Sequence, residues 1–393
     1  MQLSAPVLRM KSSFLREILA AASDPNTISL AGGLPDEKSF PLDLLKPVMA
    51  KISEDVSLFQ YGPTQGYAPL VRHLTERYEI PSNHKLLVTT GSQQGLDLIA
   101  RAFFDPGDKI VMEAPSYLGA MQVFDLVQAN ILEVPQTHEG PDLVALETCF
   151  AKQRPKAFYG VPDFHNPTGV CWSLATRQKV AQLCLTYQVT LIEDAPYREL
   201  RFSGDALPMV SSLCPDQALV LRSFSKIASP GLRVGIVTGP QAWVDALIKI
   251  KQGADLHSSV PVQAMLLGLL EHPEFDAHVA KVSNLYHGRY QVLAKALSAL
   301  EAYGCRALPA DGGMFVWLLL PDCDTMALAY TLLEQGIAAV PSDVFYSGEK
   351  AQSALRLNFT NASPERLKQA VTRLESVLKA MNGQAPQRQL VSS

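Results

Sequence analysis

One short run of residues combines an amine with groups that bind phosphate. An apolar stretch, 219–221, leads into Ser223-Phe224-Ser225-Lys226, and Arg233 follows one glycine turn later. A lysine amine can form a Schiff base with an aldehyde, whereas serine hydroxyls and an arginine fork suit a phosphate dianion. Pyridoxal phosphate carries both groups, so the run predicts a site for this cofactor. Taken alone, Lys226 is more simply interpreted as one surface lysine among many, and the hypothesis needs the cofactor's other partners.

A second phosphate-binding group is predicted where an expected strand, 85–90, meets an expected helix, 93–104. The junction contains Gly91, Ser92 and Gln93. Free backbone N–H groups and the helix dipole make such a junction an anion site, so Ser92 and Gln93 would contact a phosphate there. A Gly-Ser pair before a helix is, on its own, more often a simple N-cap.

A carboxylate suited to a pyridine ring closes another expected strand, 189–193. Glu193, Asp194 and Tyr197 follow its apolar residues. Asp194 could pair with a protonated ring nitrogen and keep the ring an electron sink, while Glu193 points to the other face of an alternating strand. Tyr197 could donate a hydrogen bond to the phenolic oxygen of the cofactor. Without the other groups, an acidic helix N-cap would be the better interpretation.

Two further strand ends carry polar or aromatic residues. Residues 161–169 include Asn166-Pro167-Thr168-Gly169, which by itself indicates only a turn. Residues 114–117 end in Tyr117, whose ring could stack on a planar cofactor, although aromatic residues in such places are usually core. All these groups follow expected strands, and in open α/β sheets ligands bind at the carboxyl ends of the strands. Their joint presence favours one shared site.

The elements that must position these groups alternate between strand and helix from residue 48 to 272, which is typical of a largely parallel sheet with helices on both faces. One of the expected strands is 129–134. A long helical stretch, 275–303, follows, and then a second, smaller α/β pattern that includes an expected strand, 338–340. We expect an N-terminal segment (1–44) packing with the small domain, a large cofactor-binding domain (45–275) and a small C-terminal domain (276–393). The polar tail 382–393 is expected to be disordered.

Length and composition allow an enzyme of this kind. The chain has 393 residues, of which 47% are hydrophobic, and this exceeds the usual size of one core. A net charge of -4 without a long basic run argues against nucleic acid as a partner. No apolar stretch is long enough to span a bilayer and no signal sequence is evident, so we expect a cytoplasmic protein. Six scattered cysteines and eight ungrouped histidines predict neither disulfides nor a metal site.

Together, these motifs resemble fold-type I pyridoxal phosphate enzymes, and specifically the class I/II aminotransferases, over residues 28 to about 359. Segments 29–35, 60–66 and 161–169 resemble the branch that holds 2-aminoadipate aminotransferase and kynurenine aminotransferase II. The resemblance implies a large domain with a mostly parallel seven-stranded sheet, a smaller α/β domain and an active site shared across a homodimer. It also implies transfer of an amino group from an L-amino acid to a 2-oxo acid, with 2-oxoglutarate the expected acceptor.

The resemblance also implies a role for each matching residue. Lys226 would hold the cofactor as a Schiff base and act as the general base, with Asp194 and Tyr197 as the other catalytic residues. Tyr61 would reach the phosphate of the other subunit. The implied cofactor-binding residues are Ser92, Gln93, Tyr117, Asn166, Asp194, Tyr197, Ser223, Ser225, Lys226, Arg233 and Tyr61.

On the substrate side, the resemblance points to Arg356, Arg16, Gly33 and Asn166. Arg356 lies in the alternating stretch 355–359, where the simpler interpretation is a solvent-facing charge on an edge strand. As an arginine, it could instead bind the substrate α-carboxylate in a bidentate manner. Arg16 resembles an arginine that binds a distal substrate carboxylate, and a helical surface residue is an equally good interpretation of it.

Two positions depart from the family pattern, and three alternatives stay open. Ser342 stands where the family usually has glycine, and Ala195 where an acidic residue is common. A lyase or decarboxylase could use the same scaffold. A non-catalytic ligand-sensing module of the MocR type is disfavoured because the enzyme-like pattern begins almost at residue 1. A P-loop or Rossmann protein would need a glycine motif that this sequence lacks.

Overall fold

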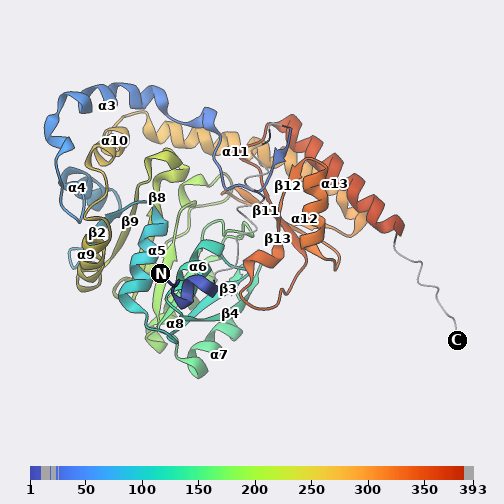
Figure 1. Ribbon diagram of the computed structural model, residues 1–393, viewed down its shortest axis with the longest axis horizontal. Helices are drawn as coiled ribbons and strands as arrows, with labels where there is room; N and C mark the ends of the chain where they lie inside the picture. The colour runs from blue at the N-terminus through green and yellow to red at the C-terminus, as the bar shows by residue number, and fades with distance from the viewer. Residues whose placement is uncertain (10–17, 19–23, 25, 385–393) are drawn as a thin grey trace.

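A computed structural model describes residues 1–9, 18, 24 and 26–384 of the chain. Two α/β units are visible, the larger one formed around a broad central sheet and the smaller one containing the C-terminal helices (Figure 1). Within the described residues, no helix is long and apolar enough to cross a membrane.

The large sheet has eight strands in the order β2-β9-β8-β7-β6-β3-β4-β5. Neighbouring strands from β8 through β4 run parallel, whereas β9 is antiparallel to both β2 and β8. Seven strands were expected, and the eighth, β5, is a two-residue strand antiparallel to β4 that no hydrophobic alternation marks. The strands are β2 (His84–Thr89), β3 (Lys109–Ala114), β4 (Asn130–Thr137), β5 (Gly140–Pro141), β6 (Ala157–Gly160), β7 (Thr190–Asp194), β8 (Ala218–Ser223) and β9 (Gly235–Pro240).

Helices cover both faces of this sheet, because its central strands are apolar on both sides. In β6, Ala157 and Tyr159 join one hydrophobic cluster while Phe158 joins another, as the alternation of a strand requires. Helices α5 and α6 pack in the first cluster, and α7 and α8 pack in the second. The helices of this unit are α3 (Leu42–Glu54), α4 (Ala68–Arg77), α5 (Ser92–Phe103), α6 (Leu118–Leu126), α7 (Leu143–Gln153), α8 (Leu174–Tyr187), α9 (Gln241–Asp255) and α10 (Val260–Leu270); a short α1 (Ala5–Arg9) precedes them.

The smaller unit contains an antiparallel sheet in the order β10-β11-β14-β13, together with a two-stranded parallel sheet of β1 and β12. Because β1 comes from the N-terminal part of the chain, residues 28 and 29 lie beside the C-terminal half of the protein, whereas α1 contacts α6 of the large unit. The elements are β1 (Ile28–Ser29), α11 (Phe275–Leu297), β10 (Arg306–Ala307), β11 (Phe315–Leu319), α12 (Thr325–Glu334), β12 (Ile337–Ala338), β13 (Val340–Pro341), β14 (Ala354–Asn358) and α13 (Pro364–Gln384).

Three details differ from the sequence prediction. The expected helix 275–303 changes after Leu297 into a 3-10 helix, Ser298–Tyr303. The expected strand 338–340 is two short strands in different sheets, β12 and β13. Helix α13 continues to Gln384, so residues 382–384 are helical and not part of a disordered tail. Other 3-10 turns are Glu37–Ser39, Val56–Phe59, Arg198–Leu200, Ser211–Leu213, Pro215–Gln217, Phe224–Lys226, Pro230–Leu232 and Ser342–Phe345.

Candidate active site

A cavity of about 270 Å³ lies at the carboxyl ends of β6, β7 and β8, between the large sheet and residues of the smaller unit. This is the edge at which an open α/β sheet binds its ligands. Most of the residues that the sequence singled out line it together. They are Gly33, Ser92, Gln93, Tyr117, Asn166, Asp194, Tyr197, Ser223, Ser225, Lys226, Arg233 and Arg356.

Lys226 lies in the 3-10 turn that follows β8. The Ser223 hydroxyl accepts a hydrogen bond from the Ser225 N–H at 3.3 Å and starts this turn. The Lys226 Nζ donates to the Gly33 carbonyl oxygen at 2.8 Å. Burial, followed by the charges of Arg233 and Arg356, lowers the pKa of Lys226 to about 8. A large share of the amine is therefore neutral near pH 8, as a nucleophile or a general base requires.

The junction of β2 and α5 offers a site for an anion. Gly91 precedes α5 with φ of 75° and ψ of 165°, a conformation open almost only to glycine, and no side chain caps the helix. A Cβ on Gly91 would collide with the Arg233 guanidinium, which donates to the Thr90 carbonyl oxygen at 3.2 Å. The first N–H groups of the helix and one arginine thus lie together, an arrangement that fits a phosphate group.

Asp194 supplies a buried carboxylate at the end of β7. Its Oδ2 accepts a hydrogen bond from the Tyr159 hydroxyl at 2.8 Å, whereas its Oδ1 has no partner among the described residues. Burial raises the pKa of Asp194 to about 7, and the Tyr159 hydrogen bond opposes this rise. A buried acceptor left without a donor is costly, and a protonated ring nitrogen would satisfy it. Asp194 therefore fits the pyridine ring of the predicted cofactor.

Three side chains beside Asp194 can contact the rest of a planar cofactor. The Asn166 Nδ2 lies 3.4 Å from the Tyr197 hydroxyl, so two donors point to one region of the cavity. The Tyr117 hydroxyl donates to the Gln93 Oε1 at 3.1 Å, which fixes the aromatic ring at the cavity wall. Burial raises the pKa of Tyr117 to about 12 and that of Tyr197 well above its usual value, so both hydroxyls remain protonated donors.

Arg356 places a buried cation in the same cavity. Strand β14 lies between β11 and β13, and Arg356 is only 3% exposed, so the alternative of a solvent-facing edge residue is wrong. Its guanidinium donates to the Asn166 Oδ1 at 2.9 Å and to the Ala31 carbonyl oxygen, and it lies 4.4 Å from the centre of the Phe315 ring.

No carboxylate among the described residues pairs with Arg356, and its Nε has no hydrogen-bond partner there. Burial lowers the pKa of Arg356 to about 10, which leaves the group charged near neutral pH. A buried, unpaired guanidinium is a binding site for a carboxylate.

Some sequence-predicted residues lie elsewhere. Tyr61 is 79% exposed and outside the cavity lining, with its ring edge-on to the His257 ring at 5.8 Å. Arg16 falls outside the described residues. Glu193 faces away from the cavity, as strand alternation predicted, and accepts hydrogen bonds from the N–H groups of Val210 and Ser211 at 3.1 and 2.7 Å.

Other cavity residues were not predicted from the sequence. Tyr159, Val161, Pro196 and Phe315 line the cavity. Strand alternation could have placed Tyr159 beside Asp194, since the two lie near the ends of neighbouring parallel strands. Phe315 belongs to the other unit, and nothing local in the sequence marks it as a cavity residue.

Ser342, the departure from glycine, is fully buried. Its hydroxyl accepts from the Ala354 N–H at 3.2 Å and lies 3.3 Å from the Thr325 hydroxyl oxygen. The extra hydroxyl thus joins β14 to the start of α12, outside the cavity lining.

Residues 26–374 match the family model "Aminotransferase class I and II", and the chain belongs to this family. It is 36% identical over 380 residues to 2-aminoadipate transaminase of Thermus thermophilus, an alignment that covers 95% of each protein. It is also 33% identical over 390 residues to aromatic-amino-acid aminotransferase 1 of Thermococcus litoralis, covering 96% of this chain and 94% of that one.

A solved structure supports the same fold. LysN, the alpha-aminoadipate aminotransferase of Thermus thermophilus in complex with N-(5'-phosphopyridoxyl)-L-leucine, superimposes with a TM-score of 0.91 at 34% identity. The match covers 97% of this chain and 98% of that one. The fold-type I architecture, pyridoxal phosphate as cofactor and the aminotransferase reaction are confirmed, and a lyase or a ligand-sensing module is not favoured.

Proposed function

We propose that this aminotransferase takes the amino group from a 2-aminoadipate-type, aromatic or branched-chain L-amino acid and transfers it to a 2-oxo acid, with 2-oxoglutarate as the acceptor. The observation that carries the proposal is that Arg356, which pairs with no carboxylate among the described residues, lines the same cavity as the Lys226 amine. Every amino acid and every 2-oxo acid has an α-carboxylate that Arg356 can bind. The Cα of the amino acid, or the carbonyl carbon of the 2-oxo acid, then lies near the Lys226 amine. The names of two relatives support the 2-aminoadipate and aromatic classes, and the leucine adduct in the LysN structure supports the branched-chain class.

Each cavity residue that the sequence predicted has a role in this proposal. When bound, the cofactor supplies an aldehyde for covalent capture and a ring that accepts electrons. Arg356 binds the substrate α-carboxylate and orients the Cα–H bond toward Lys226. The Lys226 amine, neutral in part because it is buried, accepts the proton from Cα and returns it at the cofactor.

The remaining residues hold the cofactor. Asp194 would keep the ring nitrogen protonated through its Oδ1, which has no partner among the described residues, and Asn166 and Tyr197 would donate to the phenolic oxygen. Tyr117 would contact the ring, and Gly33 would close the substrate side. The residues that would hold the phosphate are Ser92, Gln93, Ser223, Ser225 and Arg233.

The active enzyme is a homodimer in this proposal, and Tyr61 contacts the phosphate bound in the partner. Its 79% exposure in a single chain is consistent with an interface position. Residues 45–275 would form the large domain and 276–393 the small one, with segment 1–44 packed on the latter. The enzyme acts in the cytoplasm on small molecules and does not bind nucleic acid.

A panel of amino donors with 2-oxoglutarate tests the substrate class. We expect 2-aminoadipate, aromatic and branched-chain donors to change the visible absorbance of the bound cofactor and to be turned over with a high kcat/KM. Arg16→Ala should reduce kcat/KM for 2-aminoadipate more than for leucine, because only the former has a distal carboxylate to bind. Equal losses of kcat/KM for both donors would show that Arg16 does not bind the distal carboxylate. If none of the donors were turned over, the proposed substrates would be refuted.

A further inference from the structure

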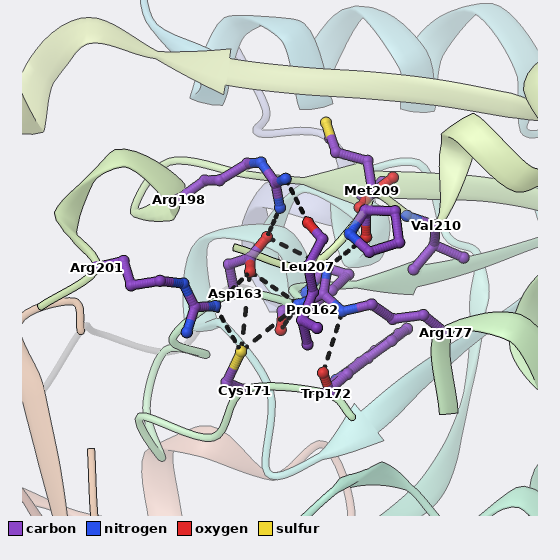
Figure 2. A network of polar contacts seen from close by, with 12 residues as sticks. Pro162, Asp163, Cys171, Trp172, Arg177, Arg198, Arg201, Leu207, Met209 and Val210 are labelled. Atoms are coloured by element: carbon purple, nitrogen blue, oxygen red, sulfur yellow. Dashed lines mark hydrogen bonds and ion pairs between the residues drawn. The ribbon is translucent and has the colours of Figure 1, made fainter. Parts of the chain in front are cut away.

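Asp163 is a buried carboxylate with three arginine partners, outside the residues so far given a role. It is 1% exposed. Its Oδ1 accepts from Arg177 at 2.8 Å and from Arg201 at 3.4 Å, and its Oδ2 accepts from Arg198 at 2.8 Å and from Arg177 at 3.4 Å. Figure 2 shows the three guanidinium groups converging on this carboxylate from different sides. We refer to these four residues as the Asp163 cluster.

The cluster is charged and almost completely hydrogen-bonded. Burial favours the neutral form of Asp163, but Arg177 and Arg198 outweigh it and hold the pKa of the carboxyl below its usual range. Arg177 also donates to the carbonyl oxygens of Trp172 and Pro162 at 3.0 and 2.9 Å (Figure 2). It donates to the Pro208 carbonyl oxygen at 3.0 Å as well. A buried polar network with satisfied donors and acceptors holds its members in one arrangement.

Two of the segments that meet at Asp163 also supply residues of the active-site cavity, whereas α8, which carries Arg177, supplies none. Asp163 precedes Asn166 by three positions, and Arg198 directly follows Tyr197. Arg201 forms an isolated antiparallel bridge with Gly312, in the segment that leads to Phe315 and β11. The Asp163 carboxylate therefore links the segment that carries Asn166 to the segment that carries Tyr197. The Asn166 Nδ2 and the Tyr197 hydroxyl lie 3.4 Å apart.

The loop that carries Asn166 contains a strained residue. Phe164 is 1% exposed and has φ of 55°, in the left-handed region that a bulky residue rarely adopts. A Cβ on Gly313 would lie 2.5 Å from the Cβ of Phe164, so the backbone of the smaller unit packs closely against Phe164 in this conformation. The Arg201 guanidinium lies 4.8 Å from the centre of the Phe164 ring. Such strain persists only where the surroundings enforce it, and the Asp163 cluster lies next to it.

We propose that Asp163 is a positioning residue whose carboxylate fixes Asn166 relative to Tyr197, and so aims both donors at the phenolic oxygen of the cofactor. Arg177 anchors the carboxylate to α8, and Arg198 transmits the constraint to Tyr197. This inference rests on the roles proposed above for Asn166 and Tyr197.

The test is the pH titration of the visible absorbance of the bound cofactor in the Asp163→Asn holoenzyme. Donors to the phenolic oxygen stabilise its negative charge, so loosening them favours the proton-bound form of the cofactor and moves the midpoint to higher pH. We expect this upward shift, together with a fall in kcat of about fivefold to tenfold, the effect of weakening one hydrogen bond. Arg198→Met keeps the Asp163–Arg177 pair but removes the Arg198 hydrogen bonds to Asp163 and to the Leu207 carbonyl oxygen. It weakens the link between Asp163 and the Tyr197 segment, so it should shift the midpoint in the same direction. If Asp163→Asn does not fold, the midpoint of the Arg198→Met holoenzyme tests the proposal in its place.

Two reference variants separate this role from general destabilisation and from the proposed function. Val180→Ala removes core volume from α8, the helix that carries Arg177, so it should lower the melting temperature and leave the midpoint unchanged. Tyr197→Phe should raise the midpoint. The proposal is overturned if Val180→Ala shifts the midpoint as much as Asp163→Asn does, or if Asp163→Asn and Arg198→Met titrate like the wild type. If Tyr197→Phe also has no effect, the role of Tyr197 is wrong and the inference fails with it; if Tyr197→Phe shifts the midpoint, only the role of Asp163 is wrong.

Discussion

Lys226 is a reactive amine because its surroundings disfavour a positive charge. It lies partly buried in a cavity that also holds the guanidinium groups of Arg233 and Arg356, and the loss of solvation together with these two charges lowers its pKa from 10.5 to about 8. A surface lysine is almost entirely protonated at the same pH and is a poor nucleophile. The Oδ1 of Asp194 and the Nε of Arg356 show a related feature, since each is a buried polar atom that has no hydrogen-bond partner among the described residues.

The low pKa of Lys226 predicts how the apoprotein captures an aldehyde. The neutral fraction of the amine grows with pH through its pKa, so the rate of covalent capture of pyridoxal should rise with a midpoint near 8. The visible absorbance of the product measures this rate. Arg356→Met removes a positive neighbour and should move the midpoint upward. A midpoint near the ordinary lysine value in the wild type would show that burial does not control this amine.

At the residue scale, the sequence predicted groups that belong to compact motifs. Lys226, Asp194, Asn166 and Arg233 could be recognised because their neighbours are unusual. The partners that complete the site could not be recognised in this way. Tyr159 is an ordinary strand residue, and the three arginines of the Asp163 cluster are separated along the chain by up to 24 positions (177 to 201), so only tertiary packing brings them together.

At the scale of elements, the junction of β2 and α5 depends on the backbone of Gly91. Its φ of 75° and ψ of 165° suit almost no other residue, and a Cβ there would displace Arg233. The proposed phosphate site therefore requires glycine for two separate reasons, the conformation of the backbone and the space for a guanidinium group.

Gly91→Ala should destabilise the fold by about 1–3 kcal/mol through backbone strain and also weaken cofactor binding. The dissociation constant of pyridoxal phosphate, measured by absorbance or fluorescence titration, checks the second effect. Gly107→Ala is the matched control: Gly107 has φ of 89°, yet its Cβ would meet nothing within 4 Å. This control should lose stability while keeping its cofactor affinity. An equal loss of affinity in both variants would mean that the Gly91 effect is strain alone.

Hydrophobic alternation and turn residues predicted the long strands to within a few residues, because each strand is buried on a defined face. Strand β4 shows the limit, since it continues to Thr137 where the prediction ended it at 134. Short strands such as β5 and β12 have two residues each, too few for a period to appear. Their hydrogen bonds come from neighbours far along the chain or from a tight turn, which local sequence does not specify.

At the scale of the whole molecule, large apolar side chains around Tyr61 face solvent in the single chain. Val56 is 81% exposed and Phe59 is 64% exposed, and both precede Tyr61 in the chain. Exposed apolar residues close together indicate a protein interface, which supports the proposed homodimer. The fold class itself followed from the order of strands and helices, but this surface could be recognised only from the folded chain.

Val56→Asp should shift the protein toward monomers and reduce activity, because a buried carboxylate without a partner disfavours association and because Tyr61 would no longer reach the second active site. Light scattering coupled to size-exclusion chromatography measures the mass. Val144→Asp, at a residue of α7 that is 78% exposed, should leave mass and activity unchanged. A wild-type protein that is monomeric and fully active would contradict the shared active site.

The most direct test of Lys226 as the group that moves the proton in an aminotransferase is the amount of 2-oxo acid released by the holoenzyme when an amino donor is supplied without an acceptor. The wild type should release about one 2-oxo acid per subunit and then stop, because the amino group remains on the cofactor. Lys226→Ala should release it at least about a hundredfold more slowly, the usual contribution of a general base. Continued release accompanied by ammonia, or release by Lys226→Ala at the wild-type rate, would contradict the account.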